Sequence, residues 1–127
     1  MTDPKLEHYK TGMNLFAQQK FAEAVAEYEK ALEHDPDWTE ALHGLAMAQM
    51  HLGKLDEAIA TGERIVKLDP NDPFAYTSLS MFYQRKGDID EAEKQQAKAR
   101  MASWKQELKT NPDAPPPTDP GGISVVQ

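Results

Sequence analysis

The sequence predicts an all-α fold made of three consecutive helical hairpins, an extended last helix and a proline-rich tail. Three observations lead to this prediction: an internal repeat of 34 residues, apolar residues at helical spacing within each repeat, and turn-forming residues between the helices. A fixed period of this size is typical of arrays in which each repeat is one supersecondary unit and neighbouring repeats share a core.

The 34-residue period connects residues of several chemical kinds. Ala24, Ala58 and Ala92 follow it, and a small residue at this place lets the two helices of a hairpin approach closely. The other residues with this spacing are Glu23, Glu57 and Glu91; Phe21, Leu55 and Ile89; Lys20 and Lys54; Gly53 and Gly87; Leu45 and Leu79; and Asp35-Pro36 with Asp69-Pro70. We therefore divide a single domain, residues 1–110, into the repeats 5–38, 39–72 and 73–106.

Large apolar residues at helical spacing mark the first helix of each repeat. They are Leu6, Tyr9, Met13 and Phe16 in the first repeat, Leu42, Leu45 and Met50 in the second, and Tyr76, Leu79, Met81 and Tyr83 in the third. Gly53 and Gly87 are predicted to end the first helix, because glycine adopts the left-handed conformation after a helix without strain. The first repeat has Gln19 there, which should cost about 1 kcal/mol. Asp88 is predicted to cap the last helix.

These features resemble the tetratricopeptide repeat family, and the resemblance covers about residues 5–106. It rests on the Leu-small pairs Leu45-Ala46 and Leu79-Ser80, the glycine between the helices, the alanine in the second helix and the closing Asp-Pro; the first repeat carries Gly12, Leu15, Ala24, Tyr28, Ala31 and Pro36. The resemblance implies a right-handed superhelix of three hairpins that binds other proteins. It does not identify the partner, because one fold serves many functions.

Gly62 departs from the family pattern, which has a large residue there, as the first repeat has Tyr28. A glycine within a helix costs about 0.5–1 kcal/mol relative to alanine. Either a neighbouring side chain fills the space above Gly62, or a backbone or ligand approaches it closely.

The resemblance also implies a concave groove lined by the first helices. The groove residues are Tyr9, Met13, Phe16, His43, Met47, Met50, His51, Phe74, Thr77, Met81, Gln84 and Arg85. Methionine is flexible and polarizable, so it adapts to irregular apolar ligands. The groove would then hold an extended or helical peptide with apolar anchors. In the alternative, Met13, Met47 and Met81 fill the core between the helices.

Some members of the family hold a terminal carboxylate of chaperones with lysine, arginine and asparagine side chains. The matching positions are Tyr9, Met13, Gly44, Phe74 and Ser78, and none of them is cationic or an asparagine. Lys10 and Asn14 lie one residue later, about 100° around the helix. We therefore expect apolar contacts, rather than a carboxylate clamp, to hold any ligand.

The last helix is predicted to run from near Asp88 to about Lys109. Its residues Ala97, Met101, Trp104 and Leu108 are spaced by three or four and share one face. This stripe either caps the array by packing on its own hairpin or forms a self-association surface, which would make the protein a homodimer.

The segment 111–127 is predicted to be an extended tail. Five prolines and two glycines occur between residues 112 and 122, and an apolar stretch, residues 123–127, follows. Prolines favour polyproline II conformation and glycines give flexible joints. Whether the tail is disordered or docked on a protein surface is left open by its composition.

Composition argues against several classes of function. The net charge of −7 disfavours nucleic-acid binding, and the chain contains no cysteine for disulfides, thiol catalysis or zinc ligation. No nucleophile motif or phosphate loop is present, so we expect no catalytic residues, no cofactor and no enzyme activity. We also expect no membrane insertion and, since residues 1–5 lack the features of a signal peptide, a cytoplasmic location.

Histidine and methionine side chains in the second repeat allow one metal site to be considered. Met47 lies four residues from both His43 and His51, and this spacing is compatible with a soft Cu(I) ion. Histidines that line a groove need no metal, so we expect none.

The sequence thus favours a protein–protein interaction module, an adaptor or co-chaperone with a methionine-lined peptide groove. One alternative is a structural protein that self-associates through the last helix or the tail. The other alternative is a specialised chaperone of the kind that bacterial secretion systems use.

Overall fold

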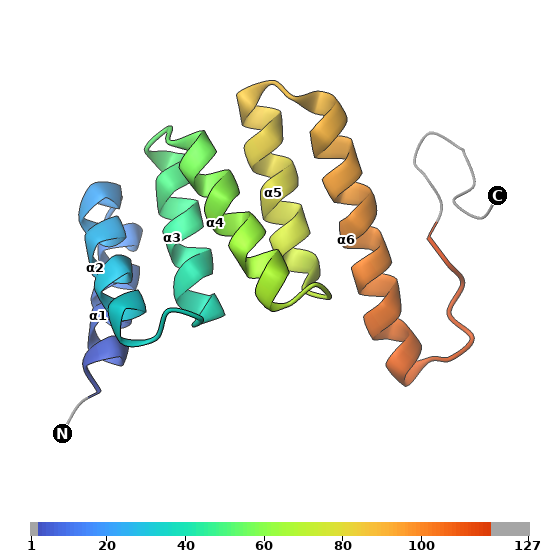
Figure 1. The fold of residues 1–127 in the computed structure, drawn as a ribbon, viewed down its shortest axis with the longest axis horizontal. Helices are drawn as coiled ribbons and strands as arrows, with labels where there is room; N and C mark the ends of the chain where they lie inside the picture. The colour runs from blue at the N-terminus through green and yellow to red at the C-terminus, as the bar shows by residue number, and fades with distance from the viewer. Residues whose placement is uncertain (1–2, 118–127) are drawn as a thin grey trace.

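Residues 3–117 are described by the computed structural model, and they form six α-helices in a row (Figure 1). The helices are α1 (Pro4–Ala17), α2 (Phe21–His34), α3 (Thr39–His51), α4 (Leu55–Leu68), α5 (Pro73–Lys86) and α6 (Ile89–Thr110). Successive helices pack against each other and pair into the hairpins α1/α2, α3/α4 and α5/α6. The predicted all-α repeat superhelix is therefore confirmed, including a last helix that ends near Lys109.

The three alanines of the 34-residue period lie inside the hairpins. Ala24, Ala58 and Ala92 are completely or almost completely buried. A larger side chain at these crossings would separate the two helices of the hairpin.

The helices form an inner and an outer layer. The first helices of neighbouring hairpins, α1, α3 and α5, contact one another in sequence as well as their own partners. Within residues 3–117 the second helices make no such contacts with each other. The first helices are therefore the more closely spaced layer, and they line the inner side of the curved array.

The turn inside each hairpin has the same geometry. Gly53 and Gly87 adopt left-handed conformations with φ of 79° and 93°, as predicted for the residue that follows a helix. Gln19 adopts the same conformation, with φ of 62°. In each turn the amide of the next residue donates to a carbonyl five positions earlier, at 2.9 Å. The left-handed backbone conformation of Gln19 therefore costs about 1–2 kcal/mol, because its Cβ atom is sterically crowded.

Aspartates cap three of the helices. The side chain of Asp3 accepts a hydrogen bond from the Lys5 amide, and Asp72 accepts one from the Phe74 amide. The Asp88 side chain accepts one from the Glu91 amide at 3.3 Å, as the sequence predicts. These bonds satisfy amide groups that have no partner within the helix.

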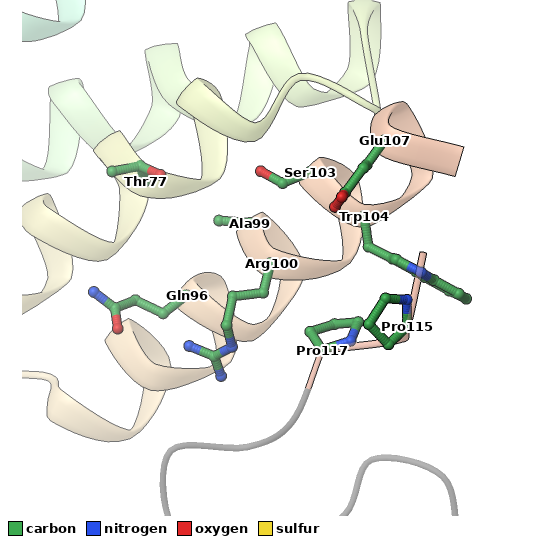
Figure 2. Close-up of a pocket in the computed structure, with 9 residues that line it drawn as sticks. All are labelled: Thr77, Gln96, Ala99, Arg100, Ser103, Trp104, Glu107, Pro115 and Pro117. Carbon is green, nitrogen blue, oxygen red and sulfur yellow. The ribbon is translucent and has the colours of Figure 1, made fainter. Parts of the chain in front are cut away.

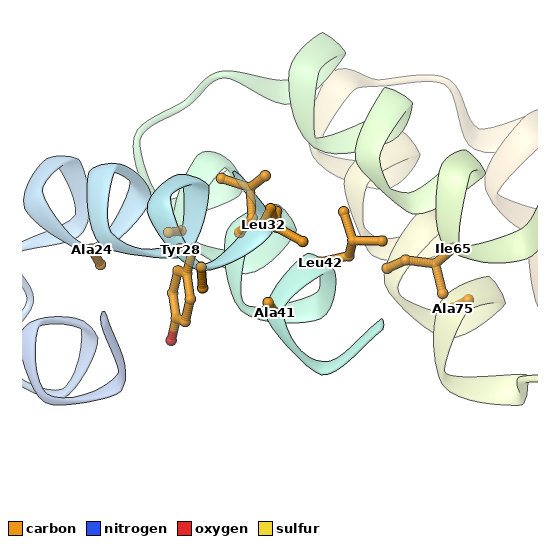
Figure 3. Close-up of a cluster of buried hydrophobic side chains, with 10 residues drawn as sticks. Ala24, Tyr28, Leu32, Ala41, Leu42, Ile65 and Ala75 are labelled. Atoms are coloured by element: carbon orange, nitrogen blue, oxygen red, sulfur yellow. The ribbon is translucent and has the colours of Figure 1, made fainter. Parts of the chain in front are cut away.

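Buried side chains form two adjoining clusters. The first cluster connects the first and second hairpins and reaches the start of α5, as Figure 3 shows with Tyr28, Leu42 and Ile65. The second cluster lies between the second and third hairpins and includes Met50 and Phe82. Together they extend from α1 to α5, so that neighbouring repeats share a core.

The space above Gly62 is filled by a neighbouring side chain. A Cβ atom on Gly62 would lie 2.7 Å from Cδ2 of Leu79, and Cε2 of Phe82 is 3.7 Å away. Of the two readings that the sequence left open, packing by a neighbouring side chain is confirmed.

Residues 111–117 follow α6 without forming a helix. Asn111 to Ala114 form a turn, Ala114 is buried, and Pro115 and Pro116 are exposed. The rest of the predicted tail, residues 118–127, lies outside the described residues.

Candidate functional site

The predicted groove residues lie on the inner helices α1, α3 and α5, but they differ in exposure. Phe74 and Met13 expose 74% and 47% of their surface, and Leu6, on the same predicted face of α1, exposes 40%. Contiguous exposed apolar patches mark interaction sites, whereas single exposed apolar residues are common on protein surfaces. These three residues are the exposed large apolar side chains that α1 and α5 carry.

Met50 does not line the groove, contrary to the prediction from the sequence. It exposes only 3% of its surface and belongs to the second cluster, together with Ala58 of α4 and Phe82 of α5. Met47 and Met81 are partly buried and pack against the same cluster. The methionines are therefore divided: Met13 is available to a ligand, Met50 is core, and the other two serve partly as core.

Tyr9 and His43 connect one hairpin to the next. The Tyr9 ring lies 4.7 Å from the Trp38 ring and 5.9 Å from the Tyr28 ring. Nε2 of His43 lies 2.9 Å from Oδ2 of Asp72, the residue that caps α5. Both side chains are half-buried by these contacts, so only part of each is exposed to a ligand.

The remaining groove residues lie towards the ends of the inner helices. Phe16, Phe21 and His51 form an aromatic group in which the Phe21 and His51 rings stack with centroids 4.4 Å apart. Thr77 is exposed, although its hydroxyl donates to the Pro73 carbonyl. Gln84 and Arg85 are exposed at the last turn of α5.

Charges of both signs border the inner surface. Lys10 and Arg85 are exposed cations on α1 and α5, and Glu40 is an exposed anion on α3. No cation occupies the positions of a carboxylate clamp, because Phe74 and Met13 are there. The surface can therefore hold apolar side chains of a ligand and can contribute single charge pairs at its border.

The predicted stripe on α6 is not one continuous surface. Ala97 is exposed, whereas Met101, Trp104 and Leu108 are half-buried. Nε1 of Trp104 donates to the Ala114 carbonyl at 3.0 Å, so the chain's own tail covers part of the indole. Ala97 and Met101 line a separate cleft with Tyr76 of α5.

A larger cleft, which the sequence did not indicate, lies between α5, α6 and residues 115–117 (Figure 2). Its volume is about 500 Å³, and it is lined by Thr77, Gln96, Ala99, Arg100, Ser103, Trp104, Glu107, Pro115 and Pro117. The motif Asn111-Pro112, which resembles the earlier Asp-Pro turns, could have drawn attention to this end of the array.

The described residues contain neither a cluster of metal-ligating side chains nor a helix suited to span a membrane. Between residues 3 and 117 no three histidine or acidic side chains come together as a metal site would require, and His43 instead pairs with Asp72. None of the helices in that range combines the length and apolar character that a membrane span needs.

Comparisons with known proteins identify a matching family and similar structures. A tetratricopeptide repeat model matches residues 15–81, and a second one matches residues 75–99. No curated protein sequence matches the chain.

Among solved structures, the crystal structure of MamA is similar, with 25% identity and a TM-score of 0.77 over 81% of this chain; the chain spans 60% of the MamA chain. The type III secretion translocator chaperone SycD of Yersinia enterocolitica has 22% identity and a TM-score of 0.77, with 87% of this chain and 84% of SycD covered. The first repeat domain of RPAP3, solved with an HSP90 peptide, has 22% identity and a TM-score of 0.69 over 87% of this chain and 82% of its own. The family model covers more than half of the residues, and the chain therefore belongs to the tetratricopeptide repeat family.

Proposed function

We propose that the inner surface of α1, α3 and α5 binds a peptide segment of a partner protein, so that this interaction module acts as an adaptor or co-chaperone. The exposure of Leu6, Met13 and Phe74 on this surface carries the proposal. Covering these side chains would remove apolar area from water, at about 25 cal/mol per Å². The proposal is in keeping with the tetratricopeptide family, whose fold serves protein interaction.

The chemistry of the surface restricts the ligand. Phe74 and Met13 occupy positions at which a carboxylate clamp would need cations, so apolar residues of the peptide provide the main contacts. Met13 can change rotamer to fit different shapes, whereas Tyr9 and His43 are held by Trp38 and Asp72. We therefore expect a ligand with two apolar anchors rather than one defined by its terminal carboxylate.

A chaperone role is one alternative to the adaptor. SycD is a translocator chaperone and has also been solved with a peptide of the translocator YopD, at 21% identity to this chain. RPAP3 was solved with an HSP90 peptide. At these identities the comparison carries the fold alone, so a secretion-type chaperone remains an alternative to the adaptor.

Self-assembly through α6 is the other alternative. The cover that Ala114 gives Trp104 reduces the apolar surface open to a second copy. Light scattering across micromolar concentrations separates the two roles, because the mass of an assembly protein must increase with concentration.

The proposal includes a cytoplasmic location, which cell fractionation tests. It includes neither catalysis nor nucleic-acid binding.

Site-specific photocrosslinking in the native cell tests the peptide-binding proposal. A photoreactive amino acid replaces Phe74 in one variant and Ile89 in a matched control. Both positions are apolar and more than half exposed, but Ile89 begins α6, outside the inner surface.

We expect a specific protein adduct from position 74 and none from position 89. Equal adducts from both positions, or adducts from position 89 alone, would move the binding site away from the inner surface. Adducts that contain only this chain would favour self-assembly.

A further inference from the structure

The chain leaves α6 through a turn of the kind that precedes a new hairpin. Asp35, Asp69 and Asn111 end α2, α4 and α6 with nearly the same backbone angles: φ of −148°, −142° and −135°, and ψ of 86°, 86° and 90°. In each turn the amide three residues later donates to the carbonyl of this residue, at 3.0–3.2 Å. The helix α6 has 22 residues, whereas α4 has 14, and this additional length places the last turn outside the 34-residue period.

Prolines prevent a further helix from starting at this turn. Pro115 stands where Pro73 begins α5, but Pro116 and Pro117 follow it directly. A residue that precedes proline is driven out of the helical region, so Ala114, Pro115 and Pro116 are all restricted to extended conformations. An extended segment therefore occupies the place at which the first helix of another hairpin would begin.

The extended segment is held by contacts of the kind that recognise polyproline chains. The indole of Trp104 donates to the Ala114 carbonyl, and Ala114 is buried beneath it. Pro115 and Pro117 line the cleft beside Trp104. Aromatic grooves bind proline-rich chains in this manner, since such chains are already extended and lose little entropy.

The cleft continues beyond Pro117 along α5 and α6. Ala99 and Ser103, one turn apart on α6, are small enough to let an extended backbone approach, and Thr77 faces them from α5 (Figure 2). Arg100 lines the same cleft and makes no ion pair within residues 3–117. The cleft thus offers small side chains and the positive charge of Arg100, while the carboxylate of Glu107 lines it two turns further along α6, near the end that Pro115 occupies.

We propose that this cleft binds residues 118–127 of the same chain as a continuation of the seated segment 114–117. From Trp104 to Gln96 the helix rises about 12 Å, and about four residues of extended chain cover that length. Asp119 lies two residues beyond Pro117 and has the charge that complements Arg100. The end of the array would then be occupied by the tail, which leaves the inner surface as the place for a partner.

Paramagnetic broadening in the full-length chain tests this placement. The sequence contains no cysteine, so Ser124→Cys gives a single site for a nitroxide label. We expect strong broadening of the Ala99 and Ser103 amide signals and none at Ala24, which lies in the first hairpin. Arg100→Asp should abolish the broadening, and adding Asp119→Arg to that variant should restore it.

Two results would overturn the proposal. One is broadening that is weak and uniform over the array. The other is broadening that appears only when a spin-labelled chain is mixed with an isotope-labelled chain that carries no spin label, since the occupant would then be a second copy. Broadening that persists in Arg100→Asp would contradict the role given to Asp119.

Discussion

The two junctions between hairpins are both closely packed, but the large residue and the glycine lie on opposite sides of the junction in the two cases. At the first junction, where α2 meets α3, Tyr28 lies against Gly12 and Gly44. At the second junction, where α4 meets α5, Gly62 takes the place of Tyr28 and lies beneath Leu79 and Phe82. Tyr28 and Gly62 are 34 residues apart and hence equivalent in the repeat.

At the first junction the large aromatic ring comes from α2, whereas at the second junction it comes from α5. Ala48 and Phe82 are also 34 residues apart, so the first junction pairs Tyr28 with a helix that carries Ala48, and the second pairs Gly62 with one that carries Phe82. Tyr28 at the first junction and Phe82 at the second are almost completely buried. The repeat therefore conserves the volume of the junction rather than the residue at one position, as expected of close-packed cores.

The largest expected effect is the loss of the ring at the second junction. Phe82→Ala should lower the free energy of unfolding by about 3–5 kcal/mol, because Phe82 is completely buried and Gly62 opposite it cannot fill the cavity. Urea unfolding measures the change. Phe74→Ala in the same helix is the control and should change the stability by about 0.5 kcal/mol or less. Equal effects would mean that Phe82 does not fill the second junction.

An added methyl group should distinguish the two junctions. In Gly44→Ala the new Cβ would lie 2.5 Å from the rigid Tyr28 ring, so overpacking should destabilise the protein by about 1–3 kcal/mol. In Gly62→Ala the contacts are with Cδ2 and Cγ of Leu79, at 2.7 and 3.0 Å; a leucine side chain adjusts more readily than the Tyr28 ring, and alanine favours the helix by about 1 kcal/mol. Gly62→Ala should therefore lie within about 1 kcal/mol of the parent. A reversed order would contradict this account of the junctions.

The hairpin turns should respond in opposite directions to the exchange of glycine. Gln19→Gly should raise the free energy of unfolding by about 1 kcal/mol, since Gln19 has a φ of 62°. Gly87→Ala should lower it by a similar amount, because a Cβ there meets no neighbour but the φ of 93° is strained. Thermal unfolding of the two variants provides the comparison, and a loss of stability in Gln19→Gly would be inconsistent with strain at that turn.

The smallest expected effect depends on pH. Burial acts to raise the pKa of Glu27, but hydrogen bonds from Lys30 and His8 outweigh it and lower that pKa below 4.5. A lowered carboxyl pKa stabilises the fold above pH 4.5, and this contribution disappears as the pH falls through the folded-state pKa. Glu27→Gln should cost about 0.5 kcal/mol at pH 7 and nothing in more acid solution. A difference that stays constant with pH would exclude the charge as its cause.

Local signals in the sequence predicted most of the fold. The hairpin turns were predicted from Gly53 and Gly87, and the cap of α6 from Asp88, because each depends on a few neighbouring residues. The burial of the Met50 side chain could not be predicted in this way. Helical spacing places it on the inner helix, but α3 lies between two other hairpins, and that position is covered by the second cluster.

The turn and the cleft at the end of the array could not be predicted for a different reason. The additional two turns of α6 move Asn111-Pro112 out of register with the earlier Asp-Pro pairs, so the period no longer marks the turn. The contact between Trp104 and Ala114 depends on this change of register. The exposure of the inner residues could not be predicted either, since the spacing that places them on one face does not determine how neighbouring hairpins cover them.

The affinity for the crosslinked partner segment tests the central claim, that the inner surface binds the partner, most directly. The variant Met13→Ser with Phe74→Ser removes two exposed apolar side chains of this surface, and Ile89→Ser removes one outside it. We expect the double variant to weaken binding by about tenfold or more, which corresponds to about 1.4 kcal/mol, and Ile89→Ser to leave it unchanged. An unchanged affinity in the double variant, with both proteins folded, would contradict the assignment of the inner surface as the binding site.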